Sequence, residues 1–386
     1  MRKVLSLLLA AALGVSMLAG CSGNTSVEAT AAETATETAA ETTAAKTVAE
    51  NAEAETAKAG TAAETGTTVA ETEAPTGESA DTTSDDETVI RVGGLKGPTT
   101  MGLVKLIDEA EQDTSKNNYE FTMVTAADEL TALVAGGKVD IALLPANVAS
   151  VLYNKTQGNV AVIDINTLGV LYLVSGDTSI TSIDQLAGKT VYLPGKGTTP
   201  DYSLRYVLSE AGLSEDDVTL EFKSEATEVA SVLAEDPNAI GLLPQPFVTA
   251  AMAQNDKLSI ILDLAEVWDS FQPEEGGSRL VTGVTIVNKS FLDEHADLVD
   301  IFLTEHEASI AFTETDIDAA AELIAAQGIV AKAPIAKKAL PFCNVEFVAG
   351  EDMKSALSGY LNVLFEQNPA SVGGALPDDA FYYVGE

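Results

Sequence analysis

Two short turns rich in glycine and threonine carry the residue types best suited to holding a small ligand. One is Gly97-Pro98-Thr99-Thr100, and the other is Gly197-Thr198-Thr199-Pro200. Each precedes a stretch of helical spacing, and a helix N-terminus attracts anions through its unpaired N–H groups and its dipole. A lysine, Lys96 or Lys196, stands directly before each glycine. The pattern predicts a site for a small anionic group. The alternative is helix capping by the threonines, with solvated lysines.

Two longer segments of the sequence share a second pattern. Asp140-Ile-Ala-Leu-Leu-Pro-Ala-Asn147 parallels Ala239-Ile-Gly-Leu-Leu-Pro-Gln245, and each reads as a buried strand that ends at a proline before a helix begins. The amides of Asn147 and Gln245 can each donate and accept hydrogen bonds, so either can fix a ligand. Local capping of the helix is the alternative for Asn147. We place Pro145, Asn147 and Gln245 in the expected ligand site.

Metal binding and catalysis have little support. His295 and His306 are the only histidines, and they lie eleven residues apart on a helix that we expect to be solvated. Histidine pairs that bind zinc usually lie about three to five residues apart. Neither a carboxylate pair nor a Ser-His-Asp motif stands out. We therefore expect a protein without a metal, a cofactor or an enzymatic activity. Trp268 can stack on a ligand ring, but packing at the edge of the second lobe is favoured.

Strands and helices alternate from residue 88 onwards, which indicates a mainly parallel sheet covered by helices. The first unit has β-like stretches at 88–92, 119–124 and 139–144, with helical spacing at 101–111 and 128–135. The second has β-like stretches at 189–193, 218–222 and 239–243, with helices at 201–212, 226–234 and 247–254. Ligands of open α/β sheets bind at the carboxyl edge of the strands, where the turns named above lie. The sequence thus predicts two similar α/β lobes.

The N-terminus has the organisation of a lipoprotein export signal. Two basic residues precede the uncharged apolar stretch Val4 to Met17, which is too short to cross a hydrocarbon core of about 30 Å. Leu18-Ala19-Gly20-Cys21 resembles the lipobox of bacterial lipoproteins. The resemblance implies removal of residues 1–20 and acylation of Cys21, for example by palmitate, on the extracytoplasmic face of the cell membrane. Cys343 would then have no disulfide partner, and we expect a small buried hydrophobe there.

Residues 22–87 differ in composition from the rest, with mostly Ala, Thr and Glu and no Phe, Tyr or Trp. Fifteen acidic residues stand against Lys46 and Lys58, a net charge of −13. Such a segment buries too little apolar surface to offset its chain entropy, so we expect residues 21–87 to be a lipidated, disordered tether. A packed helical domain is the alternative.

The remaining chain is also strongly acidic. Subtracting the tether's −13 and the signal segment's +2 from the total of −38 leaves −27 for residues 88–386. A surface of that charge argues against nucleic acid as a partner and against direct binding to anionic lipid.

Several phrases, in order along the chain, resemble the solute-binding proteins of ABC importers. More narrowly, they are similar to the branch that binds sulfonates, nitrate, taurine and thiamine precursors. Ile183 to Val191 resembles its LKGKTV segment, and Leu204 to Leu213 resembles its helix ending in AGL. Gly137 to Ala142 resembles its GxVDIA strand, and Phe291 to Val299 its FLxxHPELV helix. Ala296 departs from this pattern, because the family often has proline there.

The resemblance implies a two-lobed α/β fold of the periplasmic-binding-protein type (type II), with two interlobe crossings and a central cleft that closes on a ligand. We place the crossings near Val174 to Thr178 and Arg279 to Val284. Lobe one would comprise 88–173 with 285–386, and lobe two 174–284.

The implied function is capture of a small, anionic or polar organic solute by a monomer, followed by delivery to the permease subunits of an ABC importer. The alternatives are an enzyme of the vitamin-precursor synthesis type on the same fold, and a surface lipoprotein without a role in transport.

Overall fold

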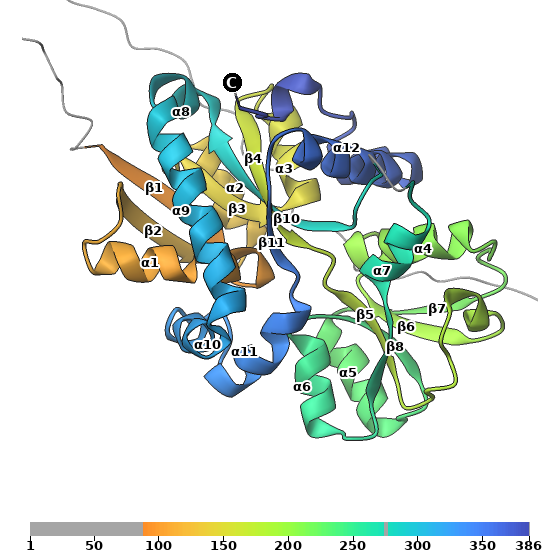
Figure 1. Ribbon diagram of the computed structural model, residues 1–386. Coiled ribbons are helices and arrows are strands. Elements are labelled where there is room, and N and C mark those ends of the chain that lie inside the picture. Colours follow the sequence, from red (N-terminus) through yellow and green to blue (C-terminus); the bar gives the residue numbers. More distant parts are fainter. Residues whose placement is uncertain (1–87, 274–276, 386) are drawn as a thin grey trace, which may run out of the picture. The chain divides into compact units, whose positions relative to one another are not determined.

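The computed structural model describes residues 88–273 and 277–385, which contain two β-sheets and the helices that cover them (Figure 1). The signal segment, Cys21 and the tether expected at residues 21–87 lie outside the described residues. Within the described residues, no helix is both long enough and apolar enough to cross a membrane.

The first sheet has six strands in the order β11-β4-β10-β3-β1-β2. β1 pairs in parallel with β2 and β3, whereas β10 runs antiparallel to β3 and β4, and β11 antiparallel to β4. The carboxyl ends of β1 to β4 therefore share one edge. The strands are β1 (Val89–Leu95), β2 (Asn118–Val124), β3 (Ile141–Pro145), β4 (Val160–Leu168), β10 (Val281–Asn288) and β11 (Val345–Val348).

Helices cover both faces of this sheet. We call the sheet and these helices lobe one. Ile141 and Leu143 of β3 pack toward α1 and α9, while Ala142 and Leu144 pack toward α2, α3 and α12. A strand buried on both faces reads as one apolar run, which explains the Ile-Ala-Leu-Leu sequence. The helices of lobe one are α1 (Val104–Glu111), α2 (Ala127–Ala135), α3 (Ala146–Lys155), α8 (Lys289–Glu294), α9 (Ala296–Thr315), α10 (Ile317–Ala326), α11 (Ala333–Ala339) and α12 (Gly350–Gln367).

The second sheet has five strands in the order β7-β6-β8-β5-β9. We call this sheet and its helices lobe two. β6 pairs in parallel with β7 and β8, and β5 runs antiparallel to β8 and β9. The strands are β5 (Leu171–Ser175), β6 (Thr190–Pro194), β7 (Thr219–Lys223), β8 (Ile240–Pro244) and β9 (Ser259–Asp263). The helices are α4 (Thr199–Glu210), α5 (Ala226–Glu235), α6 (Phe247–Gln254) and α7 (Leu264–Ser270).

Short 3₁₀ helices complete the described chain. They are η2 (Pro98–Leu103), η3 (Ile183–Leu186), η4 (Leu340–Phe342), η5 (Pro369–Val372) and η6 (Asp379–Phe381).

The chain passes between the sheets at two places. It leaves β4 at Leu168 and enters β5 at Leu171, earlier than the Val174 to Thr178 crossing that the resemblance implies. The expected boundary at residue 173 therefore falls inside a strand, because β5 already pairs with both β8 and β9 of lobe two. The return leads through α7 to β10, which begins at Val281.

Candidate functional site

The carboxyl edges of the two sheets carry the residues expected to bind a ligand. The Gly97–Thr100 turn follows β1, and Pro145 is the last residue of β3. In lobe two, the turn from Gly195 to Thr199 follows β6, and Gln245 follows β8. The expected residues thus lie on the ends of parallel strands, where backbone groups are left without ladder partners.

The lobe-one turn is closed by its own hydroxyl groups. Thr100 Oγ1 donates to the carbonyl of Leu95, and Thr99 Oγ1 lies 3.4 Å from the same oxygen. Thr99 is buried beside β10, where a Cβ added at Gly283 would come within 2.6 Å of its Cγ2. The glycine therefore lets the turn lie directly on the sheet, and both threonines serve the local structure.

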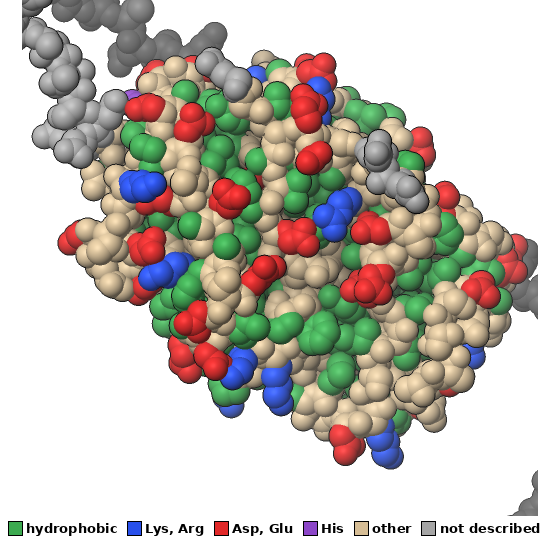
Figure 2. Space-filling model, in the orientation of Figure 1, with side chains coloured by type: hydrophobic (Ala, Val, Ile, Leu, Met, Phe, Trp, Pro, Cys, Tyr) green, Lys and Arg blue, Asp and Glu red, His purple; other side chains and the backbone are tan. Residues whose placement is uncertain are grey.

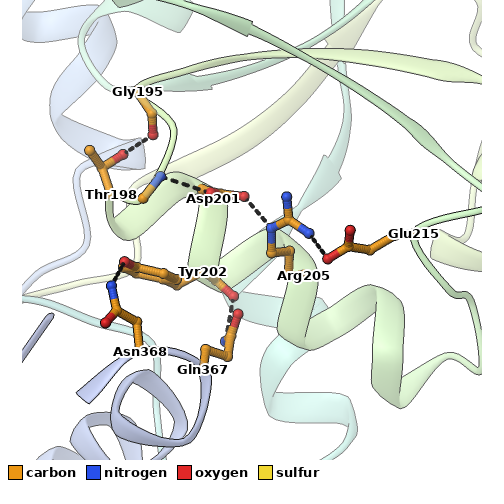
Figure 3. A network of polar contacts seen from close by, with 9 residues as sticks. Gly195, Thr198, Asp201, Tyr202, Arg205, Glu215, Gln367 and Asn368 are labelled. Carbon is orange, nitrogen blue, oxygen red and sulfur yellow. Dashed lines mark hydrogen bonds and ion pairs between the residues drawn. The ribbon is translucent and has the colours of Figure 1, made fainter. Parts of the chain in front are cut away.

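The lobe-two turn is filled by a carboxylate from its own helix. Gly197 N–H donates to Asp201 Oδ2 at 2.8 Å, and Thr198 Oγ1 donates to the carbonyl of Gly195 (Figure 3). Asp201 is buried, and its other oxygen accepts from Arg205 Nε at 2.5 Å. The Gly197 amide, which the sequence suggests is available to an external anion, already has an internal partner.

The two lysines lie against their own lobes. The Nζ atom of Lys96 lies 3.4 Å from the position of a Cβ added at Gly328, in the α10–α11 connection. The Nζ atom of Lys196 lies 5.6 Å from the centroid of the Phe222 ring, within range of a cation–π contact. Both side chains are exposed, so solvent screens their charges.

The first of the two matched amides contacts the C-terminal segment of lobe one. Pro145 precedes α3 in an extended conformation and pairs with Gly283 of β10. Asn147 Nδ2 lies 3.5 Å from the carbonyl of Ser371, at the limit of hydrogen bonding. This weak contact involves only one of the hydrogen-bonding groups of the Asn147 amide.

Gln245 retains an unused hydrogen-bonding group although it is 2% exposed. Its Oε1 accepts from the N–H of Thr249 at 3.3 Å and from the hydroxyl of Thr249 at 2.9 Å. Its Nε2 is buried and has no hydrogen-bond partner among the described residues. A buried donor without an acceptor costs about 1–3 kcal/mol, so this amide is suited to a ligand oxygen.

A cavity of about 400 Å³ lies beside Gln245, where α6 of lobe two meets α11 of lobe one (Figure 1). We call this contact the α6–α11 seam. Tyr172 on β5 donates a hydrogen bond from its hydroxyl to the carbonyl of Phe342 at 2.8 Å, which joins the lobes there. Basic and hydrophobic side chains gather over α11 in Figure 2. The cavity is lined by Gln245, Thr249, Met252, Ala253, Ile260, Lys337, Lys338, Pro341 and Phe342.

A second contact between the lobes, the α4–α12 seam, is densely hydrogen-bonded and aromatic. Gln367 Nε2 donates to the carbonyl of Tyr202 at 3.0 Å, and Asn368 Nδ2 donates to its hydroxyl at 2.7 Å (Figure 3). Trp268 is fully buried, with its ring centroid 4.1 Å from that of Tyr206 and 5.8 Å from that of Tyr360. The predicted packing of Trp268 is confirmed.

The α4–α12 seam also borders a cavity, of about 380 Å³, and the one basic residue among its described lining residues is paired within the protein. Arg205 forms ion pairs with Asp201 and Glu215, and three of the four charged lining residues are acidic. The hydroxyl of Tyr206 accepts from Gln272 at 2.7 Å. The excess of acidic side chains makes this cavity less suited to an anion than the cavity beside Gln245.

Residues 120–320, more than half of the chain, match the model of the NMT1/THI5 like family. The chain belongs to this family. No match was found among curated proteins.

Solved structures show the fold. An ABC transporter from Parabacteroides distasonis has a TM-score of 0.63 and 24% identity, and the match covers 77% of this chain and 99% of that one. The periplasmic aliphatic sulphonate binding protein SsuA from Escherichia coli has a TM-score of 0.60 and 15% identity, with coverages of 76% and 92%. A zinc-bound ligand binding component of an ABC-type import system from Staphylococcus aureus has a TM-score of 0.54 and 15% identity, and the match covers 77% of this chain and 97% of that one. The expected periplasmic-binding-protein fold is confirmed.

His306 of this NMT1/THI5-like chain is fully buried, so the expectation of a solvated histidine is wrong. Its Nδ1 lies 3.1 Å from Oδ2 of Asp164, and the hydroxyl of Thr285 donates to Oδ1 of the same carboxylate at 2.7 Å. The missed signal is Asp164 itself, since an acid inside the apolar strand β4 requires buried partners. Among the described residues, no group of three or more potential ligands is arranged for a metal.

The predicted burial of Cys343 is confirmed. The side chain is fully buried, and its thiol donates to the carbonyl of Ala339 at 3.3 Å. Burial raises the pKa of the Cys343 thiol to about 12, because the thiolate would lose its hydration. Cys343 therefore acts as a small hydrophobe in the core beneath α11.

Proposed function

We propose that this NMT1/THI5-like chain captures a small organic solute outside the membrane and delivers it to the permease subunits of an ABC importer. One observation carries the proposal: the buried amide of Gln245 lacks a hydrogen-bond partner and borders a cavity where the two lobes meet. The family and the fold support it, since solved neighbours include a periplasmic sulphonate-binding protein and a ligand-binding component of an import system. Two of these neighbours are a sulphonate binding protein and a ligand binding component, which favours binding over catalysis.

The proposed site extends from this cavity to the carboxyl edges of both sheets. It retains the Gly97–Thr100 turn, Pro145 and Asn147 from lobe one, with Lys96 nearby. Lobe two contributes Gln245 and the Thr198–Thr199 turn with Lys196. Because Asp201 occupies the Gly197 amide, we assign the main polar contact to Gln245.

A thermal-shift screen tests the proposed function. The full chain is heated with sulfonates, nitrate, pyrimidines and flavin-like compounds, and a true solute raises the unfolding temperature. A ligand at a hundredfold excess over its Kd adds about 2.7 kcal/mol to the free energy of unfolding. Chemical conversion of any compound by the purified protein would favour the enzyme on the same fold instead.

We also propose that Cys21 anchors the protein to the extracytoplasmic face of the cell membrane, since two or more acyl chains give stable anchoring where one is marginal. Cys21→Ser should move the protein from the membrane fraction into the medium. Cys343→Ser is the matched control and should leave it on the membrane. Retention of Cys21→Ser at the wild-type level would contradict the anchor and would support a different mode of attachment.

A further inference from the structure

We infer that a chain of buried polar side chains, which begins at His306, positions the Gly97–Thr100 turn of the proposed site. The inference rests on the proposed function, because the geometry of the turn matters for binding only if a solute reaches it. No member of the chain has to touch the solute, so its members are positioning residues. After His306, they are Asp164, Thr285, Asn166 and Thr167.

The chain begins on α9 and continues across β4 and β10, which are neighbouring strands of the first sheet (Figure 1). His306 Nδ1 lies 3.1 Å from Asp164 Oδ2, and the hydroxyl of Thr285 donates to Asp164 Oδ1 at 2.7 Å. Asn166 Nδ2 donates to Thr285 Oγ1 at 3.1 Å. These four residues are at most 1% exposed, so solvent does not compete for their hydrogen bonds.

The chain meets the turn at Thr167 and at Gly283. Thr167 Oγ1 donates to Asn166 Oδ1 at 3.0 Å, and it also lies 3.3 Å from the carbonyl oxygen of Pro98 in the turn. A Cβ added at Gly283 would lie 2.5 Å from Asn166 Oδ1 and 2.6 Å from Thr99 Cγ2. The amide oxygen of Asn166 and the methyl group of Thr99 therefore flank the same point of the sheet.

The carboxylate of Asp164 sets the direction of the hydrogen bonds. An ionised carboxylate only accepts, so the single hydroxyl proton of Thr285 points toward it. The oxygen of Thr285 must then accept, and the NH₂ group of Asn166 is the donor that faces it. The amide oxygen of Asn166 is left on the side of Thr167 and the turn.

This direction extends to the backbone of the turn. Thr167 has one hydroxyl proton for two acceptors, the amide oxygen of Asn166 and the carbonyl of Pro98. The orientation of the Asn166 amide therefore decides how far that proton is available to Pro98. Loss of the link at Thr285 frees the amide to rotate and changes the bonding of the turn.

Stability alone does not account for a buried acid at this position. Asp164 stands between Ile163 and Ile165 in β4, all nine residues of which are buried. Replacement of a buried ion pair by apolar residues of similar volume is often neutral or stabilising. A fixed direction along a chain of hydrogen bonds is a property that an apolar residue cannot supply. We assign that role to Asp164.

Amide hydrogen exchange tests the chain in the full-length protein in lipid nanodiscs. Thr285→Val keeps the shape of the side chain but removes the hydroxyl, and Thr285→Ser restores the hydroxyl. Thr313→Val is the matched control, because Thr313 is 2% exposed and its hydroxyl donates to the carbonyl of Ile310 in its own helix. We expect the amides of Thr99–Leu103 to exchange about tenfold faster in Thr285→Val.

Thr285→Ser and Thr313→Val should stay within about twofold of the wild type at these amides, because each leaves the chain connected. Unchanged exchange in Thr285→Val overturns the inference. An equal increase in Thr313→Val also overturns it, since the turn would then respond to any loss of buried hydroxyl groups.

Nitrogen NMR of the wild type gives a second test that requires no substitution in the chain. His295 and His306 are the only histidines, so labelling histidine with ¹⁵N gives two imidazole rings, and His295→Gln assigns them. We expect Nδ1 of His306 to carry a proton, because the carboxylate of Asp164 only accepts. An unprotonated Nδ1 in the folded protein overturns the inference.

Binding is measured separately with ethanesulfonate, nitrate, uracil and riboflavin. A compound that binds the wild type should bind about five- to tenfold more weakly to Thr285→Val, and nearly normally to Thr285→Ser. Equal affinity of Thr285→Val and the wild type overturns the positioning role. If none of the four compounds binds, the proposed function loses support, while the exchange at the turn still decides whether the chain positions it.

Discussion

The two contacts between the lobes are built from different groups. At the α4–α12 seam, the backbone and hydroxyl of Tyr202 are hydrogen-bonded to Gln367 and Asn368, and Trp268 is enclosed by aromatic rings. At the α6–α11 seam, the buried amide of Gln245 lacks a partner and Phe342 remains 43% exposed. Ser203 Oγ on α4 is also buried without a hydrogen-bond partner among the described residues, but the polar groups of Tyr202 at the α4–α12 seam are satisfied. The α6–α11 seam therefore gains more from a ligand, because the ligand would also cover the exposed Phe342 ring. From this difference we propose a permanent role for the first seam and a ligand-dependent role for the second.

The largest expected effect comes from removing the aromatic centre of the α4–α12 seam. Trp268→Ala should lower the free energy of unfolding by about 3–5 kcal/mol, because it leaves a cavity between Tyr206 and Tyr360. Phe342→Ala at the other seam should cost less than about 1 kcal/mol, since much of that ring is exposed. Chemical denaturation measures both. Equal losses would mean that the two seams contribute alike to stability.

The next effect concerns Cys343, which is buried in the core of lobe one beneath α11. The pKa of its thiol is raised from 9.0 to about 12, so the folded state retains the proton. The stability that the buried, protonated thiol contributes is fully present below about pH 9. It is lost as the pH rises from about 9 to 12. Between pH 8 and pH 10, the wild type should therefore lose about 1.4 kcal/mol more stability than Cys343→Ala.

Parallel pH dependence of the two proteins would mean that water already reaches the thiol. In that case the core beneath α11 would be open to solvent.

A smaller effect is expected from a single hydroxyl at the α4–α12 seam. Tyr202→Phe removes the acceptor of Asn368 and should cost about 1 kcal/mol of stability while leaving the affinity for an anionic probe unchanged. Tyr192→Phe is the control, because no hydrogen bond of its hydroxyl exists within the described residues. A loss of affinity in Tyr202→Phe would place the ligand at the α4–α12 seam.

Much of this arrangement could be predicted from the sequence. Apolar runs such as Ile141–Pro145 end at proline or glycine, so the strands, their carboxyl edges and Gln245 could be located without a structure. The burial of Cys343 and Trp268 also followed from residue type. The first crossing was misplaced, because the apolar run that ends at Ser175 gives no sign that its pairing changes from one sheet to the other at Leu171.

Which polar groups remain unused could not be predicted, because local and distant partners compete for them. Asp201 occupies the Gly197 amide only because the helix turns its carboxylate back over the preceding loop. His306 is buried against Asp164, which lies 142 residues away in the sequence. Lys338 reaches the cavity beside Gln245 only through the packing of α11 against α6. These pairings depend on tertiary structure rather than on spacing.

Amide hydrogen exchange with and without a bound anionic probe tests the central claim most directly. The measurement compares α6 and the Ala333–Phe342 segment with α4 and α12 in the same sample. If the solute joins the α6–α11 seam, exchange should slow in Phe247–Gln254 and in Ala333–Phe342, with little change in α4 and α12. Slower exchange in α4 and α12, with none at the α6–α11 seam, would contradict the account.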